Sequence, residues 1–467
     1  MKSDYKEYAS EWRIKDVVKK YSDYISYPVT MDVKKEEKPK DKEGKVIEDA
    51  ETITTIEEQT LNSMKAIWKR DKKDITDEEY SEFYKHISHD YTNPLERLHL
   101  SVEGILDYKA LLYVPSNAPH DMFMRESKVG VSLYVKNVFI MDDCKHILPE
   151  YLRFVKGVVD SSDLPLNVSR EILQEDKVLE KIQKNLVKKV LDLLKRMKEK
   201  ENEKYLEFYA EFGKVIKEGL YSDWSNKEKL ADLVLFESTK TEEGKYTSLK
   251  DYVAGMPEGQ KEIFYISGDS RKAVENSPHI EKFKEKSFEV LFFTDPIDEF
   301  VTNSLTEYDG KQLKSIGKGE FELEETEEEK KKKDEIKKEH QSLLELIKDN
   351  LKDDIEEVRI SNRLTDSAVC LVSKEGGLTP QMEKIMKSMN QEVPKSKRIL
   401  EINPKHLILN VMKGIFEKDK KSEKLGNYAE LLYDQALIAE GSSVKDPVKF
   451  TKRLSELMVF EGSELSK

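Results

Sequence analysis

The feature that most restricts the fold of this chain is a strand–helix–strand pattern between residues 263 and 293. It reads IFYIS, then SRKAVENSPHIEKF, then EVLFF, so two short apolar runs flank a helical segment. Two strands that are joined by a helix in this way pair parallel, through a right-handed crossover. The pattern therefore predicts a βαβ unit with parallel strands.

Helical and strand patterns alternate along much of the remaining chain. Apolar residues recur every three or four positions over residues 10–25 and again from Val178, as in amphipathic helices. Thr76 and Glu79 form a capping box that begins another helix. Strand composition marks a segment that begins near Tyr27 and three further segments, 52–59, 109–115 and 131–141. We therefore expect an α+β fold with an antiparallel-rich sheet in its N-terminal part.

Composition limits the class of function. Charged residues make up 37% of the 467 residues, and the formal net charge is −13. This acidity argues against a nucleic-acid partner, whose binding face would need clustered lysine and arginine. No apolar run approaches the length of about 18 residues that a membrane span needs. Cys144 and Cys370 lie far apart and lack metal-type spacing, which favours a reducing compartment. We expect a cytoplasmic protein without a membrane partner.

The strongest shift in composition lies over residues 319–340, GEFELEETEEEKKKKDEIKKEH. Such a run of charge is typical of a linker or of the start of a solvated helix. It places a domain boundary near 310–335. We expect a large αβ part over residues 1–255, a smaller βαβ part over 256–320 and a C-terminal domain over 321–467.

One arginine, Arg170, follows an acidic loop and stands at the start of a helical segment. The loop reads DSSDLPLNVS, and an apolar segment with two basic residues precedes it. An arginine in this position either pairs with a nearby carboxylate, such as Glu171 or Asp163, or reaches the terminal phosphate of a nucleotide. Gln174 lies one turn later on the same face and could hydrogen-bond the same group. The sequence holds no glycine-rich phosphate loop, so such a nucleotide would belong to another domain.

A second candidate feature is a Met-rich stripe on a short helix predicted over residues 378–390. The stripe consists of Leu378, Met382, Ile385, Met386 and Met389. It either packs into a core or binds varied partners at the surface, because unbranched thioether side chains adapt to different shapes. Core packing predicts a buried stripe, whereas partner binding predicts partial exposure.

Two amphipathic helices are predicted near the end of the sequence, over residues 423–440 and 447–460. Their apolar faces include Tyr428, Leu431 and Leu432 on the first helix and Leu454 and Leu457 on the second. These faces either pack within the chain or form a four-helix bundle between two copies. The second arrangement would make the protein a homodimer.

Several long motifs resemble the 90 kDa heat-shock chaperone family, and the likeness covers nearly the whole chain. LPLNVSREILQ (164–174), preceded by FIMDD (139–143) and YLRFVKGVVDSSD (151–163), resembles the family's middle domain. The other motifs are AIWKR (66–70), ITDEEYSEFYKHISHD (75–90), LLYVPSNAPHDMF (111–123), YDGK (308–311), RLTDSA (363–368) and LLYDQALIAEG (431–441). The likeness is greatest to the bacterial members. It implies a middle domain of αβα sandwich type, a smaller α/β subdomain and a C-terminal α+β dimerisation domain.

The resemblance assigns Arg170 the role of a catalytic arginine, with Asn167 and Gln174 beside it. In the family, such groups reach an ATP molecule that is held by an N-terminal domain. That domain has no counterpart in this sequence, which therefore looks like a middle and C-terminal part. ATP and Mg²⁺ are expected in the full-length protein only, and this chain alone is expected to be inactive as an ATPase.

The resemblance also implies contacts with client proteins during heat-shock stress. The Met-rich stripe matches the family's client-contacting helix. Phe300 and Asn303 match an aromatic residue and an asparagine that the family uses, with Phe in place of Trp. Trp68 is either a core residue or, as in similar proteins, part of a mobile loop that faces a client or a co-chaperone.

Together these implications predict an ATP-driven chaperone that forms a homodimer and binds unfolded or partly folded clients, with co-chaperones as candidate further partners. The alternative is a passive acidic scaffold or a co-chaperone docking module that holds no client. The scaffold predicts a buried Met-rich stripe, whereas the chaperone predicts a stripe that is partly exposed.

Overall fold

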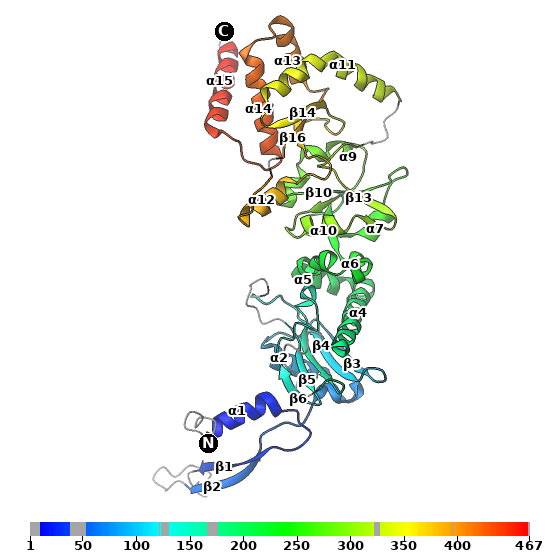
Figure 1. Cartoon of the computed structure of the whole chain (residues 1–467), viewed down its shortest axis with the longest axis vertical. Coiled ribbons are helices and arrows are strands. Elements are labelled where there is room, and N and C mark those ends of the chain that lie inside the picture. Colours follow the sequence, from blue (N-terminus) through cyan, green and yellow to red (C-terminus); the bar gives the residue numbers. More distant parts are fainter. Residues whose placement is uncertain are drawn as a thin grey trace. The chain divides into compact units, whose positions relative to one another are not determined.

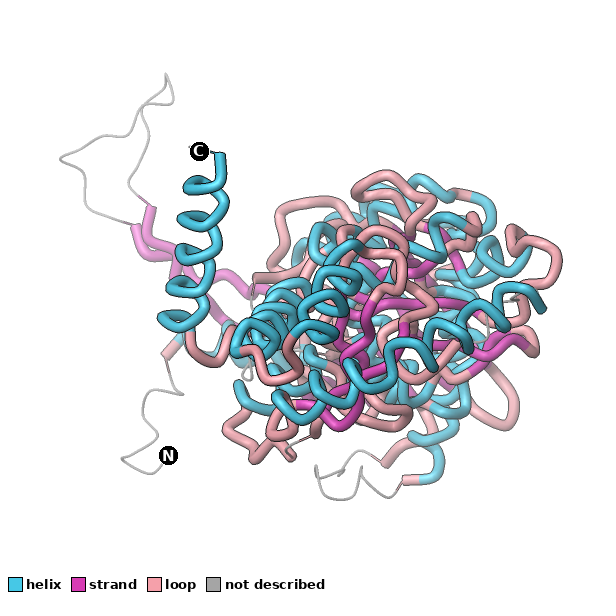
Figure 2. Tube along the Cα trace, turned by 90° about the horizontal axis from the view of Figure 1, so that it is seen from above, coloured by secondary structure: helices cyan, strands magenta, loops and turns pink. Residues whose placement is uncertain are grey.

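The computed structural model describes residues 10–37, 53–120, 122, 130–165, 176–321, 327–394 and 396–465. The chain divides into two compact units, Met1–Val215 and Ile216–Lys467, and the division falls within helix α5 (Asn202–Ser222). Figures 1 and 2 show the elements of both units. Each unit holds helices and a mixed sheet, which confirms the predicted α+β fold.

The first unit begins with a helix and a two-stranded antiparallel sheet. The helix is α1 (Glu11–Ser22), and the strands are β1 (Thr30–Glu37) and β2 (Ile53–Thr60). Their register runs from Thr30 opposite Thr60 to Glu37 opposite Ile53. The helix and both strands agree with the sequence patterns at residues 10–25, after Tyr27 and at 52–59.

A five-stranded sheet forms the centre of the first unit, in the order β3-β4-β7-β5-β6. Its strands are β3 (Glu96–Val102), β4 (Tyr108–Val114), β5 (Ser132–Val135), β6 (Val138–Met141) and β7 (Lys156–Ser161). Only β5 and β7 pair parallel, so the sheet is antiparallel-rich as predicted. The segment 131–141 is a hairpin, because Lys136 and Asn137 both take positive φ and turn the chain in two residues.

Helix α2 (Asp77–Ser88) contributes to the core beside this sheet. The capping box is present: Thr76 Oγ1 accepts a hydrogen bond from Glu79 N (3.2 Å), and Glu79 Oε2 accepts one from Thr76 N (2.9 Å). Tyr80, Phe83 and Tyr84 of α2 are buried in one cluster with sheet residues. The 3-10 helices η2 (Ile67–Lys69), η3 (Lys72–Asp74) and η4 (Glu150–Leu152) complete this part.

Two long helices follow. The side chain of Asp176 begins α4 (Lys177–Lys200) by accepting hydrogen bonds from Val178 N (2.7 Å) and Leu179 N (3.1 Å). The apolar stripe that predicts this helix is buried, at Ile182, Leu186, Val190, Leu193 and Met197. In α5, successive aromatic rings pack on one another, with Phe208 and Phe212 against Phe154.

A six-stranded sheet forms the first part of the second unit, in the order β12-β13-β10-β11-β8-β9. Its strands are β8 (Leu235–Ser238), β9 (Thr247–Ser248), β10 (Ile263–Ser267), β11 (Val290–Phe293), β12 (Glu307–Tyr308) and β13 (Lys311–Ser315). The accompanying helices are η5 (Trp224–Asn226), α6 (Lys227–Leu233), α7 (Leu249–Ala254), α8 (Arg271–Glu275), η6 (Pro278–Ile280), α9 (Glu281–Glu285) and α10 (Asp298–Ser304).

Strands β10 and β11 pair parallel, with Phe264 opposite Val290 and Ser267 opposite Phe293, and helices lie between them in the sequence. The predicted βαβ unit is therefore confirmed. Strands β8 and β9 precede the expected boundary at 255/256, yet they share this sheet. The domain boundaries themselves stay a prediction.

The C-terminal part of the second unit is built around a three-stranded sheet in the order β14-β16-β15. Its elements are α11 (Glu327–Asn350), β14 (Ile355–Ile360), β15 (Val369–Val372), α12 (Pro380–Ser388), β16 (Arg398–Ile402), α13 (Leu407–Lys418), α14 (Glu423–Ala439) and α15 (Pro447–Leu465). Strand β16 pairs parallel with β14 and antiparallel with β15. The second half of the charged run at 319–340 belongs to α11, so it is helix rather than linker there.

A buried polar network joins the two parts of the second unit. Arg363 donates to the carbonyl oxygens of Ile316 and Gly319 and to the Glu401 carboxylate, where its Nε lies 3.0 Å from Oε2. The Glu281 carboxylate accepts hydrogen bonds from the backbone amides of Thr365, Asp366 and Ser367, at 2.7 to 3.1 Å. The RLTDSA motif therefore fixes the βαβ part against the C-terminal sheet.

Candidate functional site

Helix α12 carries the Met-rich stripe at the protein surface. The side chain of Thr379 caps it by accepting a hydrogen bond from Met382 N (3.0 Å), and Pro380 occupies its first turn. No residue of α12 is buried, and Leu378, Met382, Ile385 and Met386 are each half-buried. Met389, just after the helix, is 58% exposed. The stripe has the partial exposure that partner binding predicts.

Helix α10 carries Phe300 and Asn303. Phe300 is half-buried, with its ring 5.9 Å from the ring of Tyr221 in an edge contact. Asn303 is exposed, and its Nδ2 donates to the backbone oxygen of Glu299 (3.4 Å). The Phe300 ring is partly exposed and the Asn303 amide is exposed, whereas Val301 on the same helix is buried.

A buried charge cluster anchors the start of α10. The ammonium group of Lys217 lies 2.9 Å from an oxygen of Asp295 and 2.9 Å from an oxygen of Asp298. Burial raises the pKa of Asp298 to about 6, and the attraction of Lys217 offsets only part of this shift. Lys217 also lies over the Phe236 ring, at 4.8 Å from its centroid. The cluster holds α10 against α5 and the six-stranded sheet.

One hydrogen bond joins α10 directly to the start of α12. Thr379 Oγ1 donates to Glu299 Oε2 over 2.7 Å, and both residues are buried. The same hydroxyl accepts from Met382 N, so it links the carboxylate to the first turn of α12. An ion pair between Lys384 and Asp269 adds a second link between α12 and the βαβ part. The two predicted client-contacting elements are therefore held together.

Sequence analysis did not single out Glu299 or Thr379. Thr379 followed by Pro380 is a helix-start signature, but it does not show what else the hydroxyl binds. Glu299 looks like an ordinary acidic residue in a first turn. The two positions are 80 residues apart, so no local pattern could pair them.

The terminal helices use their apolar residues in two different ways. On α14, Leu431 and Leu432 are buried and Tyr428 is half-buried. Leu432 lies in the core around the three-stranded sheet, and Tyr428 packs against that core. The apolar face of α14 therefore packs within the chain. An interface role for Leu431 and Leu432 is not carried further, because their side chains do not reach the surface.

On α15, by contrast, the apolar residues are exposed. Leu454 and Leu457 are 45% and 37% exposed, and Met458 is also exposed. Polar groups attach α15 to α14: Lys449 Nζ lies 2.8 Å from Glu430, and Arg453 pairs with the same carboxylate. Figure 1 shows α15 alongside α14 in the C-terminal part. The apolar stripe of α15 therefore lacks a covering element among the described residues.

Comparison with known proteins identifies the family. Residues 32–464 match the family described as Hsp90 protein, which is nearly the whole chain.

The chain belongs to the Hsp90 family.

Two relatives named Chaperone protein HtpG, from Geobacter metallireducens and Geobacter sulfurreducens, are each 56% identical to this chain over 466 residues. The alignments cover 99% of this chain and 72% of each relative. A Chaperone protein HtpG from Mycolicibacterium paratuberculosis is 47% identical over 451 residues, covering 96% of the chain and 69% of the relative. The resemblance to bacterial family members is thus confirmed, and it supports a chaperone role.

Trp68 is a core residue in this Hsp90 family member. Its side chain is 0% exposed, and its indole Nε1 donates to Asp160 Oδ2 over 3.0 Å. The rings of Tyr24 and Tyr134 lie 4.7 and 5.0 Å from it. The alternative position in a loop that faces a client does not occur here, because the aromatic cluster and the buried carboxylate enclose the indole.

The residues that the resemblance assigns to ATP, Asn167, Arg170 and Gln174, lie outside the described part of the chain. Among the described residues, no group of three or more His, Cys, Asp or Glu side chains could hold a metal ion. In the same part of the chain, no helix is long and apolar enough to cross a membrane.

Proposed function

We propose that this chain is the client-holding and self-associating part of an ATP-driven Hsp90 chaperone. The observation that carries the proposal is the hydrogen bond between Thr379 and Glu299, which joins two partly exposed elements. Met382, Ile385 and Met386 on α12 and Phe300 and Asn303 on α10 would together form one client surface.

The chemistry of this surface suits varied partners. A methionine side chain has three rotatable bonds and a polarizable sulfur, so it adapts to apolar segments of different shape. Phe300 adds a rigid aromatic contact. Asn303 adds an exposed amide, which can hydrogen-bond the backbone of an extended polypeptide. Exposed apolar patches of this kind mark interaction sites.

The described structure favours the client reading over a passive acidic scaffold or a docking module without client holding. The scaffold predicts a buried stripe, whereas no residue of α12 is buried. The ion pair and the hydrogen bond that hold α12 use Lys384 and Thr379, which are not members of the stripe.

Self-association is assigned to α15. Leu454, Leu457 and Met458 stand three and four positions apart, so they share one face of the helix. Polar pairs, not this face, attach α15 to α14. A second copy of the chain could cover the face in a four-helix arrangement.

Arg170, with Asn167 and Gln174, would contact ATP and Mg²⁺ that are bound by another domain of the longer family members. A guanidinium group there would neutralise charge on the terminal phosphate. This assignment rests on the family's motif at 164–174 and not on geometry. The present chain would then hold clients without hydrolysing ATP.

A light-scattering assay of client aggregation tests the client surface. Met382→Glu with Met386→Glu should weaken the prevention of aggregation, because two carboxylates replace the apolar contacts. Tyr91→Glu with Ile105→Glu is the matched control, since both side chains are 94% exposed and the charge change is the same. Unchanged holding by the α12 variant, with its fold retained, would show that the surface lies elsewhere.

A further inference from the structure

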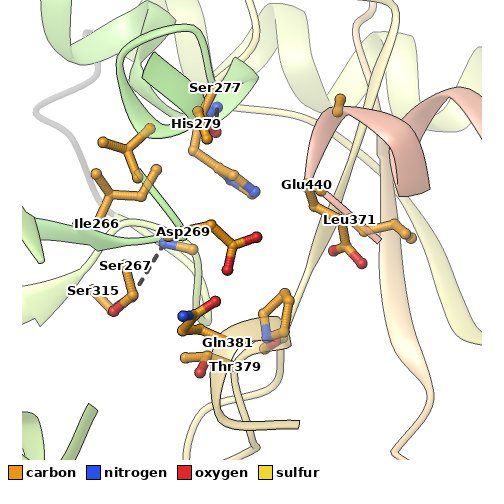
Figure 3. Close-up of a pocket in the computed structure, with 18 of the residues that line it drawn as sticks. Ile266, Ser267, Asp269, Ser277, His279, Ser315, Leu371, Thr379, Gln381 and Glu440 are labelled. Atoms are coloured by element: carbon orange, nitrogen blue, oxygen red, sulfur yellow. Dashed lines mark hydrogen bonds between the residues drawn. The ribbon is translucent and has the colours of Figure 1, made fainter. Parts of the chain in front are cut away.

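Helix α12 lies on the second unit without burying any of its own side chains. None of its nine residues is buried, whereas α14 buries most of one face. A cavity of about 70 Å³ lies against its first turn, where Thr379 and Gln381 line one side and Glu440 lines another (Figure 3). An isolated helix of this length is not stable in water. Polar contacts must therefore hold α12, and the Thr379 hydrogen bond fixes only its start.

The middle of α12 is attached by an ion pair between Glu383 and Arg398, the first residue of β16. Arg398 Nη2 lies 2.9 Å from Glu383 Oε2, and both side chains are largely shielded from water. In the ion pair between Lys384 and Asp269, by contrast, the side chains are 39% and 50% exposed. Water and salt weaken an exposed pair far more than a shielded one. The pair with Arg398 is therefore the stronger attachment.

The same guanidinium group also binds the end of α14. Arg398 Nη1 donates to Glu440 Oε2 over 2.7 Å, and Glu440 is the C-terminal capping residue of α14. Ser442 Oγ donates to the other carboxylate oxygen of Glu440 over 2.6 Å, which fixes the carboxylate. A planar guanidinium group can serve two carboxylates at once through separate N–H groups. Arg398 therefore connects α12 with α14.

The two carboxylates depend on Arg398 for their charge balance. Burial raises the pKa of Glu440, and the attraction of Arg398 opposes this shift. The negative charge of Glu383 raises the pKa of Glu440 as well, so the two carboxylates repel each other. Removing the guanidinium group would leave two like charges in a shielded place, and such a loss costs more than the intact pair contributes. The three side chains therefore act as one unit.

We propose that Arg398 is a positioning residue that holds α12, with its Met-rich stripe, by pairing with Glu383. Glu440 in turn holds Arg398. The attachment preorganises the stripe, because Met382 and Met386 share one face only while α12 stays helical. This consequence for clients rests on the proposed function, whereas the attachment itself does not. Opening of the ion pair would release α12 as one local unit.

Amide hydrogen exchange in the full chain tests the attachment. Glu383→Gln keeps the size of the side chain and removes its charge, so exchange throughout α12 should become about 10-fold faster. Glu383→Asp keeps the charge and should restore part of the protection. Glu392→Gln is the matched control, since Glu392 is exposed and lies just after α12. Unchanged exchange in Glu383→Gln, or equal acceleration in both glutamine variants, would overturn the proposal.

A general loss of stability would affect neighbouring elements as well. Exchange in β16 and α14 should stay at the wild-type rate in Glu383→Gln, because Arg398 keeps its hydrogen bond to Glu440. Lys384→Gln removes only the exposed ion pair and should speed exchange in α12 by about 2-fold. A larger effect of Lys384→Gln than of Glu383→Gln would assign the attachment to Asp269 and overturn the role of Arg398.

Arg398→Met tests the guanidinium group directly. In the wild-type background it leaves Glu383 and Glu440 without their cation, so exchange in α12 should become more than about 10-fold faster. In the Glu383→Gln background it should add little, because Arg398 acts on α12 through Glu383. Equal effects of Arg398→Met in the two backgrounds would show that it does not act through Glu383, and the proposal would fall.

Client holding is measured separately, by light scattering of an aggregating client. Glu383→Gln should weaken the prevention of aggregation, because a released α12 no longer presents the stripe on one face. Faster exchange in α12 with unchanged holding would support the positioning role of Arg398 and contradict the client role of α12. Unchanged exchange would overturn the positioning role, whatever the client assay shows. The two proposals therefore fail in different ways.

Discussion

Thr379 Oγ1 lies 2.7 Å from Glu299 Oε2, and this buried hydrogen bond connects α12 with α10. The Thr379 hydroxyl also caps α12 through Met382 N, so a single group sets both the start of the helix and its attachment. Because the Met-rich stripe follows directly, this contact helps to set its position relative to Phe300.

Thr379→Val keeps the shape of the side chain and removes the hydroxyl. It should destabilise the attachment of α12 by about 1–3 kcal/mol, since a buried carboxylate loses its donor and the helix loses its cap. Amide hydrogen exchange in α12 should then become faster, and Thr379→Ser should restore the wild-type rate. Thr302→Val serves as control, because the recorded partners of the Thr302 hydroxyl are the backbone oxygen of Glu299, within α10, and Tyr265 of β10, and neither belongs to α12. Equal protection of α12 in both valine variants would contradict the assigned role.

The buried carboxyl of Asp298 predicts a pH dependence of stability. Its folded pKa is about 6, above the ordinary value of 3.8, because burial disfavours the charged form. Folding therefore favours the protonated carboxyl. The stability that this preference adds to the folded state is fully present below pH 3.8 and is lost as the pH rises through 6. The loss is on the order of 3 kcal/mol.

Asp298→Asn mimics the protonated side chain and should remove this dependence. The melting temperature of the variant relative to the wild type should rise between pH 4 and pH 7, as the wild type loses its contribution. Asp353→Asn, at an exposed position, is the control and should follow the wild-type curve. A constant difference between the Asp298 variant and the wild type over this range would show that Asp298 does not titrate there.

The burial of Trp68 gives a spectroscopic prediction. Trp12 and Trp224 are 72% and 69% exposed, so Trp12→Phe with Trp224→Phe leaves only the enclosed indole. The remaining fluorescence should be weakly quenched by acrylamide, and it should not change when a non-native client is added. Strong quenching, or a shift on client binding, would instead place Trp68 at a contact surface. Trp68→Ala should cost about 3–5 kcal/mol of stability.

Local sequence patterns were sufficient to predict helices and strands, but they were insufficient to predict the contacts of the candidate site. The capping box at Thr76 and the parallel pair around residues 263–293 follow from rules that act within about 30 residues. The start of α11 at Glu327 was predicted only as one of two alternatives, a linker or a helix start, because the charged run there has no apolar stripe to give a period. Leu432 and Leu454 look alike in sequence, and only packing distinguishes the buried side chain from the exposed one.

The contacts that organise the candidate site join residues far apart in sequence. Glu299 with Thr379, and Glu281 with the amides of 365–367, link segments more than 75 residues apart. Such pairings depend on how whole helices and strands pack together, and the type of residue at a position does not predict them. The resemblance at 164–174 identified the family, but the placement of Trp68 in the core required the structure.

The exposed stripe on α15 predicts concentration-dependent self-association. Leu454→Glu with Leu457→Glu should weaken it by about 100-fold or more, because apolar anchors near the centre of an interface carry most of its binding energy. Leu407→Glu with Val411→Glu is the matched control on α13, where both side chains are also exposed. Multi-angle light scattering at micromolar concentration should give a dimer mass for the wild type and the control, and a monomer mass for the α15 variant. A wild-type monomer would contradict the assignment of α15, and an α15 variant that remains dimeric would place the interface on another surface.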